Sequence, residues 1–178
     1  MPHRRYSLEE ALQGLSIPEE IRRDLVLIDL PYVSFAGTEE IGQLVAHRDL
    51  EADLKAICTE LVALRFPIEK MVPIVAYDWD DERSMQDNNT SAFNYRVIIG
   101  TDRLSNHSWG RAIDINPRLN PYHARDGKVY PAGATLNPSV PGTITADSAV
   151  IPLFTSRGWV WGGTWKGRED YQHFQKEN

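Results

Sequence analysis

The sequence contains little cysteine and no long hydrophobic segment. Cys58 is the only cysteine among 178 residues, which excludes an internal disulfide and leaves the redox compartment undetermined. No run of about 18 apolar residues occurs, so we expect no membrane-spanning helix. Residues 1–10 include basic side chains but no apolar segment behind them, so we also expect no secretory signal in this chain.

The sequence is also poor in positive charge. Lys and Arg number 19 against 25 Asp and Glu, which gives a formal net charge of −6 and a pI near 5.4. Because nucleic-acid binding depends on clustered Lys and Arg, we expect no nucleic-acid partner. The hydrophobic content of 42% is enough for one sizeable core. No repeat or linker divides the chain, so we predict a single domain over 1–178.

The first half of the chain shows mainly helical patterns. Ser7 and Glu10 have the spacing of a capping box, and apolar residues at intervals of three and four give segment 48–66 one apolar stripe. Pro67 prevents extension of that helix. The predicted elements are helices over 7–14, 18–25 and 48–66, strands over 26–35 and 71–77, an exposed loop over 78–89 and a helical turn over 90–95. We interpret residues 1–30 as a helical N-terminal extension.

The second half is more irregular and carries most of the polar motifs. Residues 112–116 alternate, so Ile113 and Ile115 should face the core while Asp114 lies on the other face of a strand. A long segment, 118–145, is rich in Pro, Gly, Asn and Tyr, and we expect it to form a loop that covers the functional site. The remaining predicted elements are a helix over 147–156 and a short strand at 173–174.

Two imidazoles and a carboxylate in this half have the composition of a catalytic zinc site. His107, Asp114 and His173 would bind the metal and leave a fourth position open for water. Asp170, three residues before the last imidazole, is placed to take the proton of that water. Helical zinc motifs such as His-Glu-x-x-His are absent. Spacing alone leaves open that the same residues are buried, hydrogen-bonded polar groups without a metal.

These motifs resemble those of the zinc D-alanyl-D-alanine carboxypeptidases and L-alanyl-D-glutamate endopeptidases of the VanY and VanX type. The family pattern is Ser-x-His-x-x-Gly-x-Ala-x-Asp, followed by an acidic residue three positions before a second His. The residues of this chain that match the pattern are Ser105, His107, Gly110, Ala112, Asp114, Asp170 and His173. The resemblance covers residues 30–178, and within the family the chain is similar to the branch with an extended N-terminal region. It implies that residues 105–178 form the metal-binding half.

The resemblance implies one Zn²⁺ per chain, bound by His107, Asp114 and His173. It also implies that Asp170 acts as general base and that Arg96 polarises the scissile carbonyl and stabilises the oxyanion. Two alternatives stay open, because Asp170 can instead hold His173 in one tautomer and Arg96 can form a surface ion pair. The residues expected to line the substrate cleft are Ser105, Trp109, Tyr122, Trp161 and Trp165.

By the same resemblance, the substrate is a peptidoglycan stem peptide and the reaction removes a terminal D-Ala. Three alternatives are an endopeptidase of the endolysin or toxin kind, a non-catalytic zinc module as in hedgehog domains, and an interaction protein without metal. We expect action on the cell wall, in the periplasm or outside the cell. The protein would reach the cell wall by one of three routes: an export signal that has been truncated, phage-type release, or a dedicated secretion system. A cytoplasmic dipeptidase is the alternative location. No inhibitor or immunity partner can be inferred.

The distribution of elements favours the α+β class, because helices gather in the first half and short strands surround the predicted ligands. The resemblance implies the hedgehog/DD-peptidase fold. In that fold, a small and mainly antiparallel sheet carries the zinc site, and helices pack on it.

Overall fold

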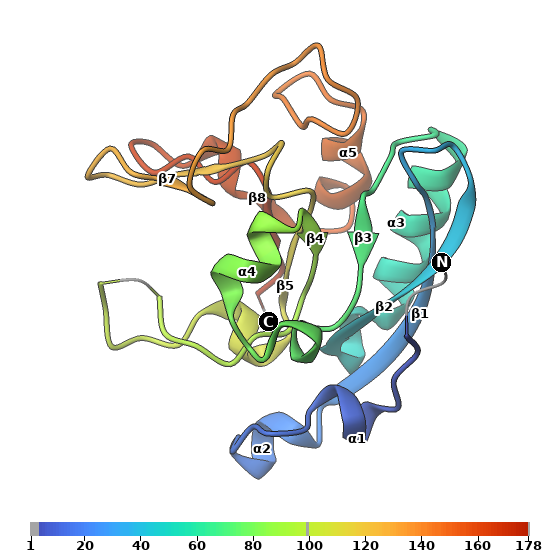
Figure 1. Cartoon of the computed structure of the whole chain (residues 1–178), viewed down its shortest axis with the longest axis vertical. Coiled ribbons are helices and arrows are strands. Elements are labelled where there is room, and N and C mark those ends of the chain that lie inside the picture. Colours follow the sequence, from blue (N-terminus) through green and yellow to red (C-terminus); the bar gives the residue numbers. More distant parts are fainter. Residues whose placement is uncertain (1–3, 99, 178) are drawn as a thin grey trace.

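The two longest strands pair as an antiparallel hairpin. The computed structural model describes residues 4–98 and 100–177, in which β1 (Leu25–Val33) and β2 (Glu39–His47) lie side by side (Figure 1). β1 confirms the strand predicted over 26–35. No strand is predicted at β2, where Gly42 interrupts the hydrophobic pattern. A Cβ at Gly42 would collide with the Met71 side chain, so this glycine permits the close approach of the next strand.

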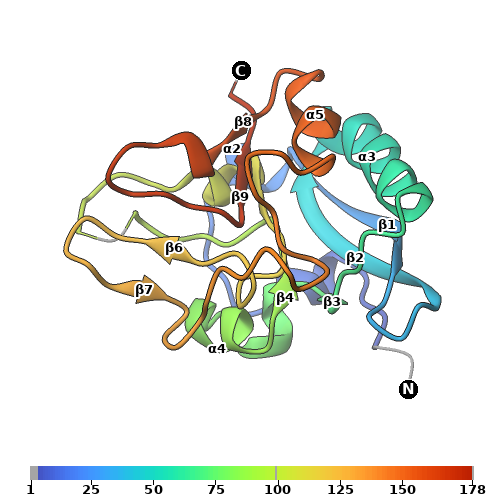
Figure 2. The same cartoon turned by 90° about the horizontal axis from the view of Figure 1, so that it is seen from above.

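Helix α3 (Glu51–Ala63) packs against β1 and covers one side of the hairpin (Figures 1 and 2). The buried residues of the helix are Leu54, Ile57, Cys58 and Leu61. Burying each leucine or isoleucine contributes about 1.5–3 kcal/mol, so the predicted stripe holds this helix in place. The helix ends before the predicted limit at residue 66, and Leu64 is 48% exposed outside the stripe. The surrounding core draws on residues from Ile28 to Phe174, and therefore on both halves of the chain.

Both predicted N-terminal helices are present in shortened form. α1 (Leu8–Ala11) begins with the predicted capping box, in which Glu10 N donates to Ser7 Oγ and Ser7 N donates to Glu10 Oε2. α2 (Glu19–Arg22) follows Pro18, as predicted. Residues 1–3 of the predicted extension lie outside the described residues.

The predicted strand over 71–77 is wrong except at its first residue. β3 spans only Lys70–Met71. The chain then enters a 3₁₀ turn over Ile74–Tyr77, which follows Pro73. Because proline fixes its own φ and lacks a donor, it favours the start of such a turn over the continuation of a strand.

The two predictions that follow, an exposed loop over 78–89 and a helical turn over 90–95, are also wrong. α4 (Asp81–Gln86) occupies the middle of the predicted loop. Its first turn is capped by the Asp80 carboxylate, which accepts a hydrogen bond from Arg83 N at 3.0 Å. β4 (Asn89–Thr90) then pairs in parallel with β3, a long-range contact that outweighs the local capping tendency of the threonine.

A three-stranded antiparallel sheet of order β5–β9–β8 lies at the centre of the second half. Its strands are β5 (Ala112–Asp114), β9 (His173–Gln175) and β8 (Val160–Trp161). Ile113 and Ile115 are buried in the core, which confirms the predicted alternation. α5 (Val150–Thr155) lies within the predicted helical segment and contacts β8 and α3.

The predicted loop over 118–145 contains a short hairpin that was not expected. β6 (Tyr122–His123) pairs with β7 (Val129–Tyr130) in antiparallel fashion, and Figure 2 shows this hairpin on the side of the molecule away from α3. The turn between them contains Asp126 and Gly127. Gly127 has a φ of +82°, which an Asp-Gly hairpin turn requires.

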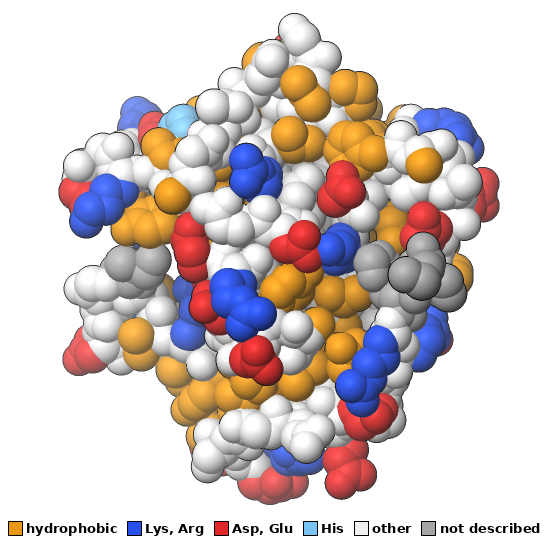
Figure 3. Space-filling view, in the orientation of Figure 1, with side chains coloured by type: hydrophobic (Ala, Val, Ile, Leu, Met, Phe, Trp, Pro, Cys, Tyr) orange, Lys and Arg blue, Asp and Glu red, His pale blue; other side chains and the backbone are white. Residues whose placement is uncertain are grey.

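The architecture is α+β, with few helices and small, mainly antiparallel sheets, and it is consistent with the fold implied by the resemblance. Within residues 4–98 and 100–177, no helix is long and apolar enough to cross a membrane. On the face drawn in Figure 3, Lys and Arg side chains lie among Asp and Glu side chains and form no continuous basic surface among the residues drawn in colour.

Candidate metal centre

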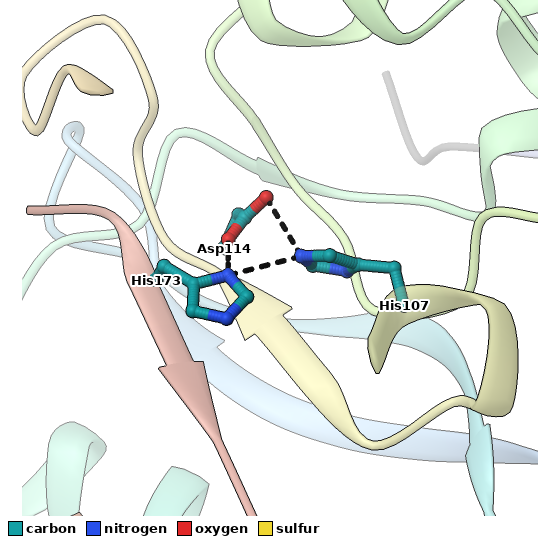
Figure 4. A group of neighbouring side chains, drawn as sticks. All are labelled: His107, Asp114 and His173. Atoms are coloured by element: carbon teal, nitrogen blue, oxygen red, sulfur yellow. Dashed lines mark hydrogen bonds and ion pairs between the residues drawn. The ribbon is translucent and has the colours of Figure 1, made fainter. Parts of the chain in front are cut away.

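Three buried side chains from separate segments converge at the sheet (Figure 4). His107 comes from a 3₁₀ turn (Asn106–Trp109), Asp114 from the end of β5 and His173 from the start of β9. The oxygens of Asp114 lie 3.1 Å from His107 Nε2 and 2.9 Å from His173 Nδ1, and these two nitrogens are 3.1 Å apart. The structure therefore brings the three predicted ligands together as a group that can hold a metal ion.

The backbone explains why these residues meet. Asp114 and His173 are direct partners in the antiparallel register of β5 and β9, so their side chains lie on the same face of the sheet. Two hydrogen bonds with Ser91, from Asp114 N at 2.9 Å and from Ser91 N at 3.1 Å, fix the other edge of β5. The turn that carries His107 begins at Ser105, whose Oγ accepts a hydrogen bond from His107 N at 3.3 Å.

Hydrogen bonds on the far side of each imidazole fix its tautomer. His107 Nδ1 donates to the Ala92 carbonyl at 2.5 Å, and His173 Nε2 donates to Gln175 Oε1 at 3.0 Å. His107 Nε2 and His173 Nδ1 therefore face Asp114 with lone pairs, which is the arrangement found around protein-bound metals. Without a cation or an additional proton between them, these lone pairs and the carboxylate repel one another.

The donor set fits zinc in both chemistry and spacing. Zinc–ligand distances of about 2.0–2.1 Å in a tetrahedron place neighbouring ligand atoms about 3.3 Å apart, close to the observed 2.9–3.1 Å. Burial alone raises the pKa of Asp114, whereas positive charge and donated hydrogen bonds from the His107 and His173 side chains lower it more. A metal cation held by the neutral imidazoles would supply that positive charge instead and keep the carboxyl group ionised. An anionic carboxylate with two neutral imidazoles leaves one position open on the metal.

Asp170 lies in the same cavity as this group. Its Oδ1 is buried and has no hydrogen-bond partner among the described residues. Burial raises the pKa of Asp170 to about 7; the charge of Asp114 adds to this effect, whereas His173 and Arg96 oppose it. A carboxyl group with a pKa near neutrality and a free acceptor atom is suited to proton transfer.

Arg96 makes an ion pair and borders the same cavity. Its Nε lies 2.9 Å from Asp81 Oδ2, and both residues line the cavity. Its backbone is fixed by Ser108, whose Oγ accepts from Arg96 N at 2.9 Å and donates to Arg96 O at 2.7 Å. The ion-pair alternative and the cavity position are therefore compatible: Arg96 pairs with Asp81 through charge, without a hydrogen bond from Nε to any described residue, and still borders the cavity.

The cavity has a volume of about 270 Å³. Of the five residues predicted to line it, Ser105, Tyr122 and Trp165 do so. Trp109 is 40% exposed and borders a neighbouring cavity beside α2, because the turn that places His107 inward directs Trp109 outward. Trp161 is 4% exposed and stacks on Phe174 in the core, so it does not line the cavity.

Only part of the segment 118–145 reaches the cavity. Tyr122 and Tyr130 line it from the β6–β7 hairpin, and their rings stack at 6.1 Å. Residues 138–143 border a different surface cavity beside Phe66 and Pro67. The hairpin, and not the whole predicted loop, therefore forms this wall of the site.

The two groups that orient the imidazoles, the Ala92 carbonyl and the Gln175 side chain, are not among the residues predicted from the sequence. Gln175 lies two residues after His173 on the same strand, so a period of two places both on one face and would have indicated it. The Ala92 carbonyl has no such signal, because a backbone acceptor is independent of residue type. Asp81, the partner of Arg96, lies in a segment predicted to be an exposed loop.

Gly110 is a position where we predict a large loss of stability on substitution. It ends the turn that carries His107 with a φ of +65°, and a Cβ there would lie 2.6 Å from His47 N. Gly110→Ala should lower the free energy of unfolding by about 2–4 kcal/mol, from backbone strain plus the collision. Gly133→Ala is the matched control, since its φ of +75° is similar but nothing lies within 4 Å. Equal losses in urea unfolding would show that the contact with His47 is unimportant.

The match to a known protein family lies in the half of the chain that contains the metal group. No curated protein and no solved structure matches the chain. Residues 99–176 match a family model described as D-alanyl-D-alanine carboxypeptidase. This segment is less than half of the chain; it includes His107, Asp114, Asp170 and His173 but not Arg96. Over residues 99–176, the chain is thus similar to the D-alanyl-D-alanine carboxypeptidase family, and this similarity supports a peptidase.

Proposed function

We propose that the protein is a zinc-dependent peptidase that removes the terminal D-Ala from peptidoglycan stem peptides. One observation carries the proposal: two imidazole lone pairs and the Asp114 carboxylate converge within 3.1 Å, in a cavity that also holds the unpartnered Asp170 oxygen. The similarity of residues 99–176 to D-alanyl-D-alanine carboxypeptidases supports the choice of reaction and substrate. We further propose that the protein acts on the cell wall.

In this proposal, each residue of the site has a defined role. His107, Asp114 and His173 hold one Zn²⁺, which when bound supplies a Lewis acid and makes a water molecule acidic enough to attack near neutral pH. Asp170 accepts the proton of the attacking water on its carboxylate and later gives it to the leaving amine. The Arg96 guanidinium donates to the carbonyl oxygen of the scissile bond as negative charge develops there. Ser105 and Tyr122, which both line the cavity, contact the peptide.

Replacing Arg96 should reduce turnover without removing the metal. We expect Arg96→Ala to lower kcat about 100-fold, because one donor to the developing oxyanion is lost. Arg96→Lys should keep part of the activity, since it retains the charge but not the planar donor fork. Asp81→Asn is the matched control: it breaks the same ion pair and leaves the guanidinium in place. If Asp81→Asn and Arg96→Ala lower kcat equally, Arg96 contributes only through its ion pair.

The function is tested by mass spectrometry of products from purified stem peptides incubated with zinc-loaded protein. Asp170→Asn serves as the inactive control. Loss of one D-Ala with the wild-type protein alone would establish the carboxypeptidase, whereas internal fragments would establish an endopeptidase instead. A protein that retains zinc but forms neither product would overturn the proposed activity and favour a non-catalytic zinc module.

A further inference from the structure

Arginines are concentrated at this cavity in a chain whose overall charge is negative. Arg96, Arg103 and Arg168 all line it, although the formal net charge of the chain is −6. Arg96 is paired with Asp81. Arg103 and Arg168 have exposed side chains, and neither forms an ion pair with any residue within 4–98 or 100–177.

The acidic residues that line the cavity do not neutralise these two arginines. Asp81 is paired with Arg96, Asp114 belongs to the metal group, and Asp170 is the proposed base. Glu177 is the one other acidic side chain among the described lining residues, and it accepts a hydrogen bond from Gln175 Nε2 at 3.2 Å. The cavity mouth therefore presents two guanidinium groups that no described carboxylate pairs with.

Arg168 is held over the cavity by an aromatic ring. Its guanidinium carbon lies 4.8 Å from the centroid of the Trp165 ring, within the range of a cation–π contact. The Trp165 ring is in turn 5.3 Å from the His173 ring. The contact orients Arg168 near the metal group, and no residue in the described part of the chain accepts a hydrogen bond from its guanidinium. An oriented guanidinium fork matches a carboxylate better than any other ligand group of a peptide.

We propose that Arg168, with Arg103 on a separate loop, forms a subsite for a substrate carboxylate outside the scissile peptide bond. The inference rests on the proposed function and deepens it: the preferred substrate is an acidic stem peptide whose non-terminal carboxyl groups are free and not amidated. Arg168 is thus a specificity-determining residue. It binds the carboxylate equally in the ground state and the transition state, so its contribution lies in KM and not in kcat.

The test compares two stem peptides that differ only in one non-terminal carboxyl group, which is free in one and a carboxamide in the other. Each carboxyl group is amidated in turn, and kcat and KM are measured with zinc-loaded protein. For Arg168→Gln we expect KM to rise about tenfold on the free acid, with little change in kcat and no change on the matching carboxamide. Arg103→Gln should show a smaller effect of the same kind. Arg125→Gln is the control, because it removes an exposed charge that does not line the cavity.

Three outcomes decide between the possibilities. A selective rise in KM for Arg168→Gln, absent in Arg125→Gln, would support the subsite. Equal effects on acid and carboxamide, or no effect, would overturn the subsite while the peptidase activity of the wild type stands. If the wild type cleaves none of the peptides, the proposed function fails. In that case, the affinity of the protein for the acidic peptide, measured by calorimetry, tests whether the carboxylate subsite exists. Binding that is weakened by Arg168→Gln and not by Arg125→Gln would then support it, and its absence would overturn it.

Discussion

Asp170→Asn is expected to lower kcat by about 100- to 10,000-fold while the protein keeps its metal, because the substitution removes a proton acceptor without removing a ligand. Asp170 is not a member of the His107, Asp114 and His173 group, so zinc content measured by elemental analysis should not change. The amide is nearly isosteric with the carboxyl group, so the walls of the cavity should keep their shape. The loss should appear in kcat and in kcat/KM alike, as for an interaction made only in the transition state.

The same variant should not be less stable than the wild type. Burial raises the pKa of Asp170 to about 7, far above the value of about 3.9 for a carboxyl group in an unfolded chain. The stabilising contribution of a raised pKa is present at low pH and is lost as the pH rises through the folded-state value. At pH 8 in the metal-free protein, the ionised carboxylate therefore destabilises the fold, and the neutral amide relieves this. Thermal unfolding of metal-free wild type and variant at pH 8 measures the difference.

Asp147→Asn is the control for both measurements, since Asp147 is exposed and does not line the cavity. It should change neither kcat nor the unfolding temperature. An Asp170→Asn variant with nearly full activity would place the base elsewhere. A variant that is inactive, unstable and deficient in zinc would instead show that the Asp170 carboxyl group supports the structure of the site; it does not fix the His173 tautomer, because the two ring nitrogens of His173 face Asp114 and Gln175.

Local signals in the sequence were sufficient for elements whose stability is local. The capping box at Ser7 and Glu10 and the apolar stripe of α3 correspond to observed helices, because both depend on contacts within a few residues. β4 was not predicted, because it is stabilised by pairing with β3, 19 residues earlier in the chain. β2 pairs with the neighbouring β1, but Gly42 interrupts its hydrophobic pattern. A glycine such as Gly42 reads as a weak strand residue, whereas the structure needs it for the close approach of β3.

The candidate site shows the same difference between features that sequence signals predict and features that depend on pairing between distant segments. Spacing and family resemblance selected His107, Asp114 and His173, which the structure brings together. The reason for their meeting is the register of β5 and β9, which joins residues 59 positions apart and has no signature in a single sequence. The aromatic predictions were less specific, because a tryptophan beside glycines can face the cavity, the core or solvent. Trp165, Trp161 and Trp109 show these three environments in turn.

Metal binding should stabilise the fold by several kcal/mol, and the effect should depend on each of the three proposed ligands. At a free zinc concentration about 1,000 times the dissociation constant, linkage gives about 4 kcal/mol. For a chain of this size, that corresponds to a rise of about 10 °C in the unfolding temperature. His173→Ala should abolish most of this rise and lower the bound zinc. Asp114→Asn, which preserves side-chain volume, should act in the same direction if the alanine variant folds poorly.

The control for this prediction is His123→Ala. His123 packs against the Tyr171 ring and lies outside the metal group, so its replacement removes an imidazole without removing a proposed ligand. Zinc should stabilise this variant as much as the wild type. If His173→Ala retains a full equivalent of zinc and the full rise, His173 is not a ligand. The 3.1 Å approach of the two ring nitrogens would then require a proton, in place of a metal ion, to offset their repulsion.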